Sequence, residues 1–141
     1  MENKTRVLGL DIGDRYIGVA MSDPGRMLAS PLTILKRGDD TTVIKAITGI
    51  IDEHGVSRVI VGLPLSLDGQ SHHQARKVEA FTQQLSESTE ITLEYRDERY
   101  STVAAKQLLA AGGKKGGRKK PRDDAAAAAV ILQGYLDELR P

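Results

Sequence analysis

The stretch Gly9-Leu10-Asp11-Ile12-Gly13-Asp14-Arg15-Tyr16-Ile17-Gly18-Val19-Ala20 decides the fold of this chain. An apolar run ends in the carboxylate of Asp11, and a second apolar run begins at Ile17, after a turn that contains a glycine. This order predicts a strand, a tight turn and a returning strand. Asp11 then stands where the first strand leaves the sheet, a position that suits a metal ligand better than a packing residue. The competing interpretation is an Asx-turn, although Gly13 and Asp14 already supply turn chemistry.

Three further strands and four helices follow from the periodicity of the apolar residues. The predicted strands cover residues 6–12, 17–22, 28–35, 58–62 and 91–95, and Pro24-Gly25 forms the turn before the third. The predicted helices run from a cap at Asp39 or Asp40 to Gly55, over 71–86, over 102–111, and from a cap at Asp123 or Asp124 to about residue 139.

The order of these elements predicts an α/β fold. Three strands with tight connections form an antiparallel meander, and the strand-helix-strand-helix-strand series that follows adds parallel neighbours through right-handed crossovers. The expected result is a mixed five-stranded sheet with helices on both faces. A length of 141 residues is enough for one domain with its own core, so we expect residues 1–141 to form a single domain.

Composition excludes several classes of protein and site. There is no cysteine, so disulfides, zinc-thiolate sites and thiol nucleophiles are all ruled out. One Phe and no Trp argue against the base-stacking platforms of single-strand binders. No stretch approaches the ~20 apolar residues of a membrane span, and the N-terminus lacks the profile of a signal peptide. We therefore expect a cytoplasmic protein without a membrane partner.

The net charge of +1 hides a strongly basic segment at residues 112–122. Its charged residues are all basic: Lys114, Lys115, Arg118, Lys119, Lys120 and Arg122. The rest of the chain holds all 19 acidic residues and is net negative. A basic segment on an acidic body predicts contact with a polyanion at one place, so we expect a flexible loop that binds nucleic acid. The alternative is a solvated loop without a ligand.

Acidic residues at three predicted element boundaries suggest a metal site. Besides Asp11, these are Asp97-Glu98 after the fifth strand and Asp123-Asp124 at the last helix. Magnesium and manganese prefer carboxylate oxygens, and two-metal cleavage of a phosphodiester needs several acids at one point. The alternatives are a surface ion pair for Asp97-Glu98 and a helix cap for Asp123-Asp124. Strand alternation puts Asp97 and Glu98 on opposite faces, so one of them at most faces the site.

These residues resemble the YqgF/RuvX proteins, a bacterial group of Holliday junction resolvase-like nucleases with an RNase H-type fold. Four motifs in the same order carry the resemblance over nearly the whole chain, and together they are highly specific. They are Gly9-Leu10-Asp11-Ile12-Gly13 with Ile17-Gly18-Val19-Ala20 and Ser22-Asp23; Val61-Gly62-Leu63-Pro64 with Asp68-Gly69; Asp97-Glu98-Arg99 with Ser101-Thr102; and Asp124 with Ala127-Ala128, Ile131-Leu132-Gln133 and Tyr135-Leu136.

The resemblance implies a nuclease in which Asp11, Glu98 and Asp124 are the catalytic residues and hold Mg²⁺ or Mn²⁺. It places Asp124, not Asp123, at the family position, and it favours Glu98 without excluding Asp97. The chain departs from RuvC-type resolvases, which carry a glutamate after the fourth strand, where this chain has Leu63-Pro64. The third acid must therefore come from the fifth strand, and resolvase activity does not follow from the resemblance.

The function that the resemblance implies is maturation of the 5′ end of 16S ribosomal RNA, in contact with structured RNA and a pre-ribosomal particle. The alternatives are resolution of branched four-way DNA junctions, which needs a homodimer where RNA trimming allows a monomer, and a nucleic-acid-binding ribosome-assembly module without catalysis. Actin-like ATPases and sugar kinases share the opening motif. They need two such domains and a second glycine-rich loop, which this chain lacks.

Overall fold

The computed structural model describes residues 5–64, 72–97 and 121–139, with the backbone alone for residue 72 and residues 121–124. Its centre is a five-stranded sheet in the order β3-β2-β1-β4-β5. The strands are β1 (Arg6–Ile12), β2 (Tyr16–Ser22), β3 (Ala29–Lys36), β4 (Val56–Leu63) and β5 (Thr92–Asp97). The helices are α1 (Asp40–His54), α2 (His72–Ser86) and α4 (Pro121–Leu139). None of these helices is long and apolar enough to cross a membrane.

The sheet is mixed, as the sequence predicts, with β1 at its centre. β1 pairs with β2 in antiparallel register and with β4 in parallel register. β2 pairs with β3 antiparallel, and β4 with β5 parallel. The two parallel connections carry α1 and α2, because a crossover between parallel strands needs a helix-sized segment. The carboxyl ends of β1, β4 and β5 therefore meet at one edge of the sheet.

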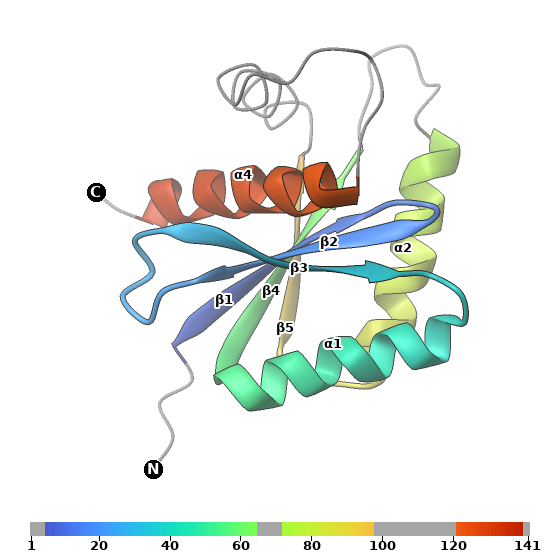
Figure 1. Ribbon diagram of the computed structural model, residues 1–141, viewed down its shortest axis with the longest axis horizontal. Helices are drawn as coiled ribbons and strands as arrows, with labels where there is room; N and C mark the ends of the chain where they lie inside the picture. Colours follow the sequence, from blue (N-terminus) through green and yellow to red (C-terminus); the bar gives the residue numbers. More distant parts are fainter. Residues whose placement is uncertain (1–4, 65–71, 98–120, 140–141) are drawn as a thin grey trace.

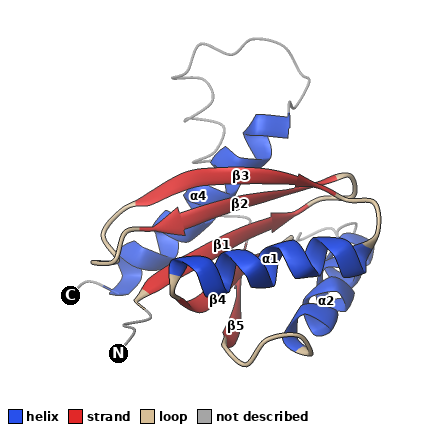
Figure 2. Ribbon diagram, turned by 60° about the horizontal axis from the view of Figure 1, so that its bottom comes forward, coloured by secondary structure: helices blue, strands red, loops and turns tan. Residues whose placement is uncertain are grey.

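Helices α1 and α2 cover one face of the sheet (Figures 1 and 2). Their buried residues recur at the helical spacing that predicted them, and they pack on Leu8, Leu10 and Ile12 of β1. Gly55 ends α1 in the left-handed conformation, with φ 69°. Asp39 is the residue before the first turn of α1, and its side chain accepts a hydrogen bond from the Thr42 hydroxyl.

Helix α4 covers the opposite face and forms a second, smaller core (Figure 1). Its alanines let it lie close to the sheet, and Ala128, Ile131 and Leu132 are fully buried there. Gln133 ties the helix to the β2–β3 connection, since its side-chain oxygen accepts from the Ala29 N–H and its NH₂ group donates to the Met27 carbonyl. The prediction of helices on both faces is confirmed.

Several predicted boundaries differ from the structure by one to three residues. The largest difference with a functional consequence concerns α4, which begins at Pro121. Proline suits the first position of a helix because the N–H that it lacks has no partner there. The prediction that Asp123 or Asp124 is the N-cap is therefore wrong, since both residues are already within the first turn. Pro121 and Arg122 are likewise helical, not part of a loop that extends to 122. The predicted helix 102–111 lies outside the described residues.

Candidate active site

Asp11 is the one predicted metal ligand whose side chain the structure describes. It is the penultimate residue of β1 and lies opposite Gly18 of β2. Its neighbours Leu10 and Ile12 point into the core under α1 and α2. Strand alternation therefore places Asp11 on the other face, which α4 covers. Only 7% of Asp11 is exposed, so a charged side chain is held largely away from water at the carboxyl edge of the sheet.

The turn after Asp11 depends on Gly13. The Gly13 N–H donates to the Tyr16 carbonyl at 2.9 Å, and a Cβ atom at position 13 would lie 2.8 Å from that same oxygen. A glycine is thus the residue that closes this connection without displacing the backbone. The short turn fixes where β1 ends, and with it the position of Asp11.

Helix α4 brings the backbone of Asp124 toward the same point. Gly9, two residues before Asp11 on the same face, lies against Ala128 and Leu132 of α4. Gln133, farther along α4, bonds the N–H of Ala29. Ala29 pairs with Ser22 of β2, and the Ser22 hydroxyl accepts from the Val7 N–H, so Gln133 lies nearer to Val7 than to Asp11 along β1. The helix therefore runs antiparallel to β1. Four helical residues back from Ala128 span ~6 Å, and two strand residues on from Gly9 span ~7 Å.

These two displacements run in the same direction, so the first turn of α4 lies near the carboxyl end of β1. Figure 1 shows this end of α4 on the side of the molecule that holds the β1–β2 turn. The backbone thus brings the positions of Asp11 and Asp124 together, although they are far apart in the sequence.

The third acid was predicted at Asp97 or Glu98, and the structure bears on Asp97. Leu93 of β5 packs on the core under α1 and α2, whereas Arg96 contacts Gly134 and Glu138 of α4. Asp97, next to Arg96, is therefore on the α1/α2 face by alternation, opposite to Asp11. Glu98 lies outside the described residues, as do Lys114, Lys115, Arg118, Lys119 and Lys120.

The end of β4 agrees with the departure from RuvC-type resolvases. β4 ends at Leu63, which packs against the core under α1 and α2. An apolar side chain at that position supplies no oxygen ligand, so β4 adds no acid to the site. Within the described parts of the chain, no three His, Asp or Glu side chains form a metal-binding group.

Two arginines at this edge make contacts that the sequence analysis did not predict. The Arg96 guanidinium lies over Gly134 and bonds both carboxylate oxygens of Glu138, at 2.8 and 2.6 Å. It thereby anchors α4 to the end of β5. Arg37 bonds the β1–β2 turn. Both contacts join segments distant in sequence, so no local pattern predicts them. The i,i+3 spacing of Arg37 and Asp40 was the single hint available.

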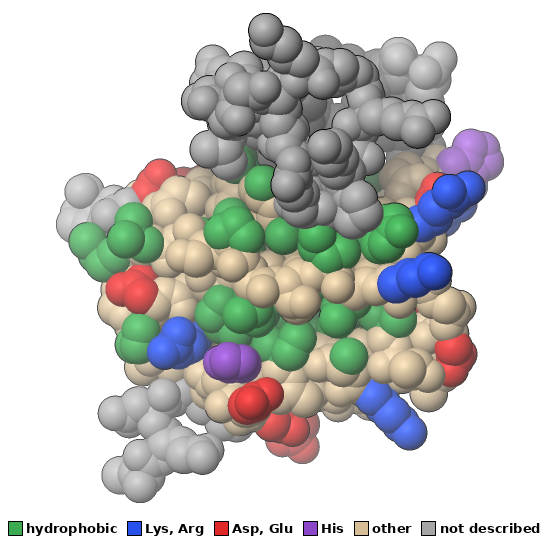
Figure 3. All heavy atoms as spheres, in the orientation of Figure 1, with side chains coloured by type: hydrophobic (Ala, Val, Ile, Leu, Met, Phe, Trp, Pro, Cys, Tyr) green, Lys and Arg blue, Asp and Glu red, His purple; other side chains and the backbone are tan. Residues whose placement is uncertain are grey.

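Exposed basic side chains also lie near the carboxyl edge. Arg15 in the β1–β2 turn and Arg76 and Lys77 in the first half of α2 are exposed. Most Lys and Arg side chains visible in Figure 3 lie on the side where Figure 1 shows α2 and the β1–β2 turn. These exposed basic side chains suit contact with a phosphate backbone.

A site with a buried carboxylate at the carboxyl edge fits a divalent ion. Asp11 offers hard oxygen ligands on a rigid central strand, which Mg²⁺ and Mn²⁺ prefer. The backbone of Asp124 approaches the same edge on a helix whose packing is fixed. The arrangement is able to hold an ion against the phosphate of a substrate.

Comparison with known proteins finds relatives that match nearly the whole chain. The family model described as "RuvX: Holliday junction resolvase" matches residues 5–138. A protein of Dehalococcoides mccartyi named "Putative pre-16S rRNA nuclease" is 49% identical, over 92% of this chain and 96% of its own length. A protein of Roseiflexus sp. with the same name is 42% identical, over 96% of both chains.

Solved structures with low sequence identity share the fold. Thermus thermophilus RuvC, in complex with a Holliday junction substrate, matches with a TM-score of 0.62 and 15% identity over 96% of both chains. The yeast mitochondrial Holliday junction resolvase Ydc2 matches with a TM-score of 0.58 and 12% identity, over 96% of this chain and 79% of its own. The fold of this chain is therefore the RNase H-like fold of these resolvases.

Proposed function

The chain belongs to the RuvX family and is a hydrolase of the nuclease type, and from this premise we propose that it is a metal-dependent endonuclease that matures the 5′ end of 16S ribosomal RNA. One observation carries the proposal from the structure: the buried carboxylate of Asp11 lies at the carboxyl edge of β1, on the face to which the first turn of α4 comes close. Structured RNA within a pre-ribosomal particle is the proposed substrate, and its cytoplasmic synthesis in bacteria sets the proposed compartment.

The proposed catalytic residues and metal ligands are Asp11, Glu98 and Asp124, with Mg²⁺ or Mn²⁺ as the cofactor. Asp97 is less suited than Glu98, because it occupies the opposite face of the sheet from Asp11. Asp11, Glu98 and Asp124 would hold the ions, which would activate a water as nucleophile and stabilise the leaving oxygen. Asp11, on the central strand β1, is proposed to fix the position of the metal ions relative to the other ligands. Attack of water on phosphorus forms one P–O bond and breaks the bond to the leaving nucleotide oxygen.

The basic segment, Lys114 to Arg122, is proposed to hold the phosphate backbone beside these acids. Its last two residues, Pro121 and Arg122, already belong to α4, and the first turn of α4 carries Asp124. Contacts of lysine and arginine with phosphates position a nucleic acid without reading its sequence. The proposed contacts with the phosphate backbone are then a few residues from Asp124, one of the proposed metal ligands. Both belong to the single domain that we propose for residues 1–141.

Resolution of four-way DNA junctions is the second candidate, and the description of the matching family favours it. Symmetric cutting of a junction needs two active sites and so a homodimer, whereas RNA trimming works in a monomer. A ribosome-assembly module without catalysis is the third candidate, and it needs no ion at Asp11.

One experiment separates these candidates. Purified protein is incubated with a labelled precursor 16S RNA fragment and with a labelled four-way DNA junction, each with Mn²⁺ or with EDTA. We expect cleavage of the RNA that requires Mn²⁺. Paired symmetric cuts in the junction, without RNA cleavage, would assign the protein to recombination. Binding of RNA with no cutting of either substrate would leave the assembly module.

A further inference from the structure

Arg37 holds the turn that follows Asp11. It lies directly after β3, and its backbone N–H donates to the Arg15 carbonyl at 2.8 Å. Its guanidinium Nη1 donates to the Gly13 carbonyl at 2.9 Å. Gly13 and Arg15 flank the tip of the β1–β2 turn, so a single residue holds both sides of it. Only 17% of the Arg37 side chain is exposed.

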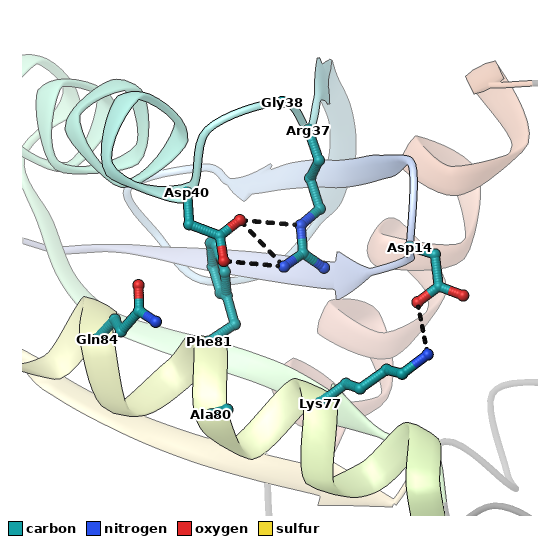
Figure 4. Close-up of a pocket in the computed structure, with 8 residues that line it drawn as sticks. All are labelled: Asp14, Arg37, Gly38, Asp40, Lys77, Ala80, Phe81 and Gln84. Atoms are coloured by element: carbon teal, nitrogen blue, oxygen red, sulfur yellow. Dashed lines mark hydrogen bonds and ion pairs between the residues drawn. The ribbon is translucent and has the colours of Figure 1, made fainter.

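The guanidinium of Arg37 is itself fixed from two other directions. Asp40, in the first turn of α1, accepts from Nε at 3.3 Å and from Nη2 at 3.1 and 3.2 Å. The ring of Phe81 on α2 lies beneath it, with the guanidinium carbon 5.0 Å from the ring centre. Figure 4 shows the Arg37 guanidinium beside Asp40 and Phe81, at a pocket of about 390 Å³. Arg37 thus connects the turn to α1 and α2.

The end of β1 needs such support. The register of β1 with β4 runs to the pair Leu10–Val61, whereas the register of β1 with β2 continues through Asp11–Gly18 and Ile12–Ile17 to the turn. The contact of Arg37 with Gly13 is a second restraint, two residues beyond Asp11. The nearby Lys77–Asp14 ion pair is a weak substitute, because it is 3.6 Å long and both side chains are about 60% exposed.

We infer that Arg37 is a positioning residue for the metal site, which keeps the Asp11 carboxylate in its ligand geometry through the Gly13 carbonyl. The inference rests on the proposed function, because it assumes that Asp11 is a metal ligand. The planar fork of arginine bonds Gly13 and Asp40 at once while it stacks on Phe81, and a lysine ammonium does not reproduce this arrangement. Residues that orient ligands are worth about 10- to 100-fold in metal affinity or activity.

The test compares Arg37→Lys with Arg58→Lys. Arg58 is the matched control, since it also pairs with a carboxylate, Glu94, at 2.6 Å, but lies toward the amino end of β4. Mn²⁺ affinity is measured by titration calorimetry on protein shown to be folded by circular dichroism, and kcat and KM are measured on the precursor RNA. We expect Arg37→Lys to bind Mn²⁺ about 10- to 100-fold more weakly and to lose kcat by a similar factor at unchanged KM. Arg58→Lys is expected to match the wild type.

Each other outcome has a definite meaning. A folded Arg37→Lys with the Mn²⁺ affinity and kcat of the wild type would overturn the inference and leave the proposed function intact. A wild type that neither binds Mn²⁺ nor cleaves would overturn the proposed function, and the inference with it. If Arg37→Lys binds Mn²⁺ more weakly and neither protein cleaves, the result would support Arg37 as a positioning residue and would reject the precursor RNA as the substrate. If Arg37→Lys fails to fold, Asp40→Asn carries the same expectation, and unchanged Mn²⁺ affinity there would overturn the inference.

Discussion

Gly9 determines how closely β1 and α4 approach one another. A Cβ atom at this position would lie 2.8 Å from the Leu132 Cβ and 3.0 Å from the Ala128 carbonyl oxygen. Neither atom is the end of a flexible side chain, so the helix would have to move as a unit. Because the same contact sets the first turn of α4 against the end of β1, Gly9 serves the geometry of the proposed site as well as the packing.

Replacing Gly9 by alanine tests this close approach. Gly9→Ala is expected to lower the free energy of unfolding by about 1–3 kcal/mol, because the added methyl overpacks the interface. Gly49 is the control: it lies in α1 with open space around it, and Gly49→Ala is expected to stabilise by about 1 kcal/mol through helix propensity. Urea unfolding measures both. Equal effects of the two substitutions would contradict the account of Gly9.

Among the elements, the connection between β2 and β3 shows how a predicted turn is completed by side chains. Pro24-Gly25 forms the turn, and the Arg26 N–H donates to the Asp23 carbonyl at 3.0 Å. Arg26 has a positive φ of 58°. Its guanidinium reaches the Thr5 carbonyl at 2.7 Å and the Ser57 hydroxyl at 2.9 Å. The connection thereby bonds to the amino ends of β1 and β4.

Asp23 makes the stability that this turn contributes depend on pH. The backbone N–H groups of Leu28 and Met27 donate to its carboxylate and hold the pKa of Asp23 below its ordinary value of 3.8. A lowered pKa in the folded state contributes stability above 3.8 that is lost as the pH falls through the folded value. Asp23→Asn should therefore be less stable than the wild type at neutral pH, and the difference should vanish in acid. Urea midpoints at several pH values measure it, and a gap that does not change with pH would refute the role of the charge.

The sequence was sufficient to predict α1, α2 and the five strands, since their apolar periods are strong and local. It failed where the deciding contact is distant. Aspartate is a favoured cap, so the sequence predicts a start of α4 at Asp123 or Asp124, whereas the helix begins at Pro121. The face of Asp97 required the register of β5 with β4 and the contacts of Arg96 with α4. The contacts of Arg37 could not be predicted, because they depend on how β3, the β1–β2 turn and α2 come together in the fold.

The whole molecule places the proposed chemistry at one edge of the sheet. Asp11 and the first turn of α4 are there, and exposed basic residues of the β1–β2 turn and α2 lie near that edge. The pocket at the amino end of the sheet is lined instead by Asp52, Glu87 and Glu90. The exposed basic residues near the carboxyl edge favour approach of a polyanion from that side.

The basic segment is expected to supply the electrostatic part of RNA affinity. Replacing Lys114, Lys119 and Lys120 together by glutamine should weaken binding to all RNA sequences and lower the slope of log affinity against log salt by about one for each lost phosphate contact. Lys45→Gln, an exposed change on α1, is the control and should leave the slope unchanged. Filter binding over a range of salt concentrations measures both. An unchanged slope in the triple variant would place the phosphate contacts elsewhere.

The most direct test of the central claim compares Asp11→Asn with Asp14→Asn, two identical changes three residues apart. Asp14 is 62% exposed in the turn after β1, whereas Asp11 is buried at the proposed metal site. Cleavage of the precursor RNA fragment in Mn²⁺ is measured under single-turnover conditions, with folding checked by circular dichroism. We predict that Asp11→Asn folds and loses cleavage, while Asp14→Asn cleaves at nearly the wild-type rate. Cleavage that survives in Asp11→Asn would contradict the account.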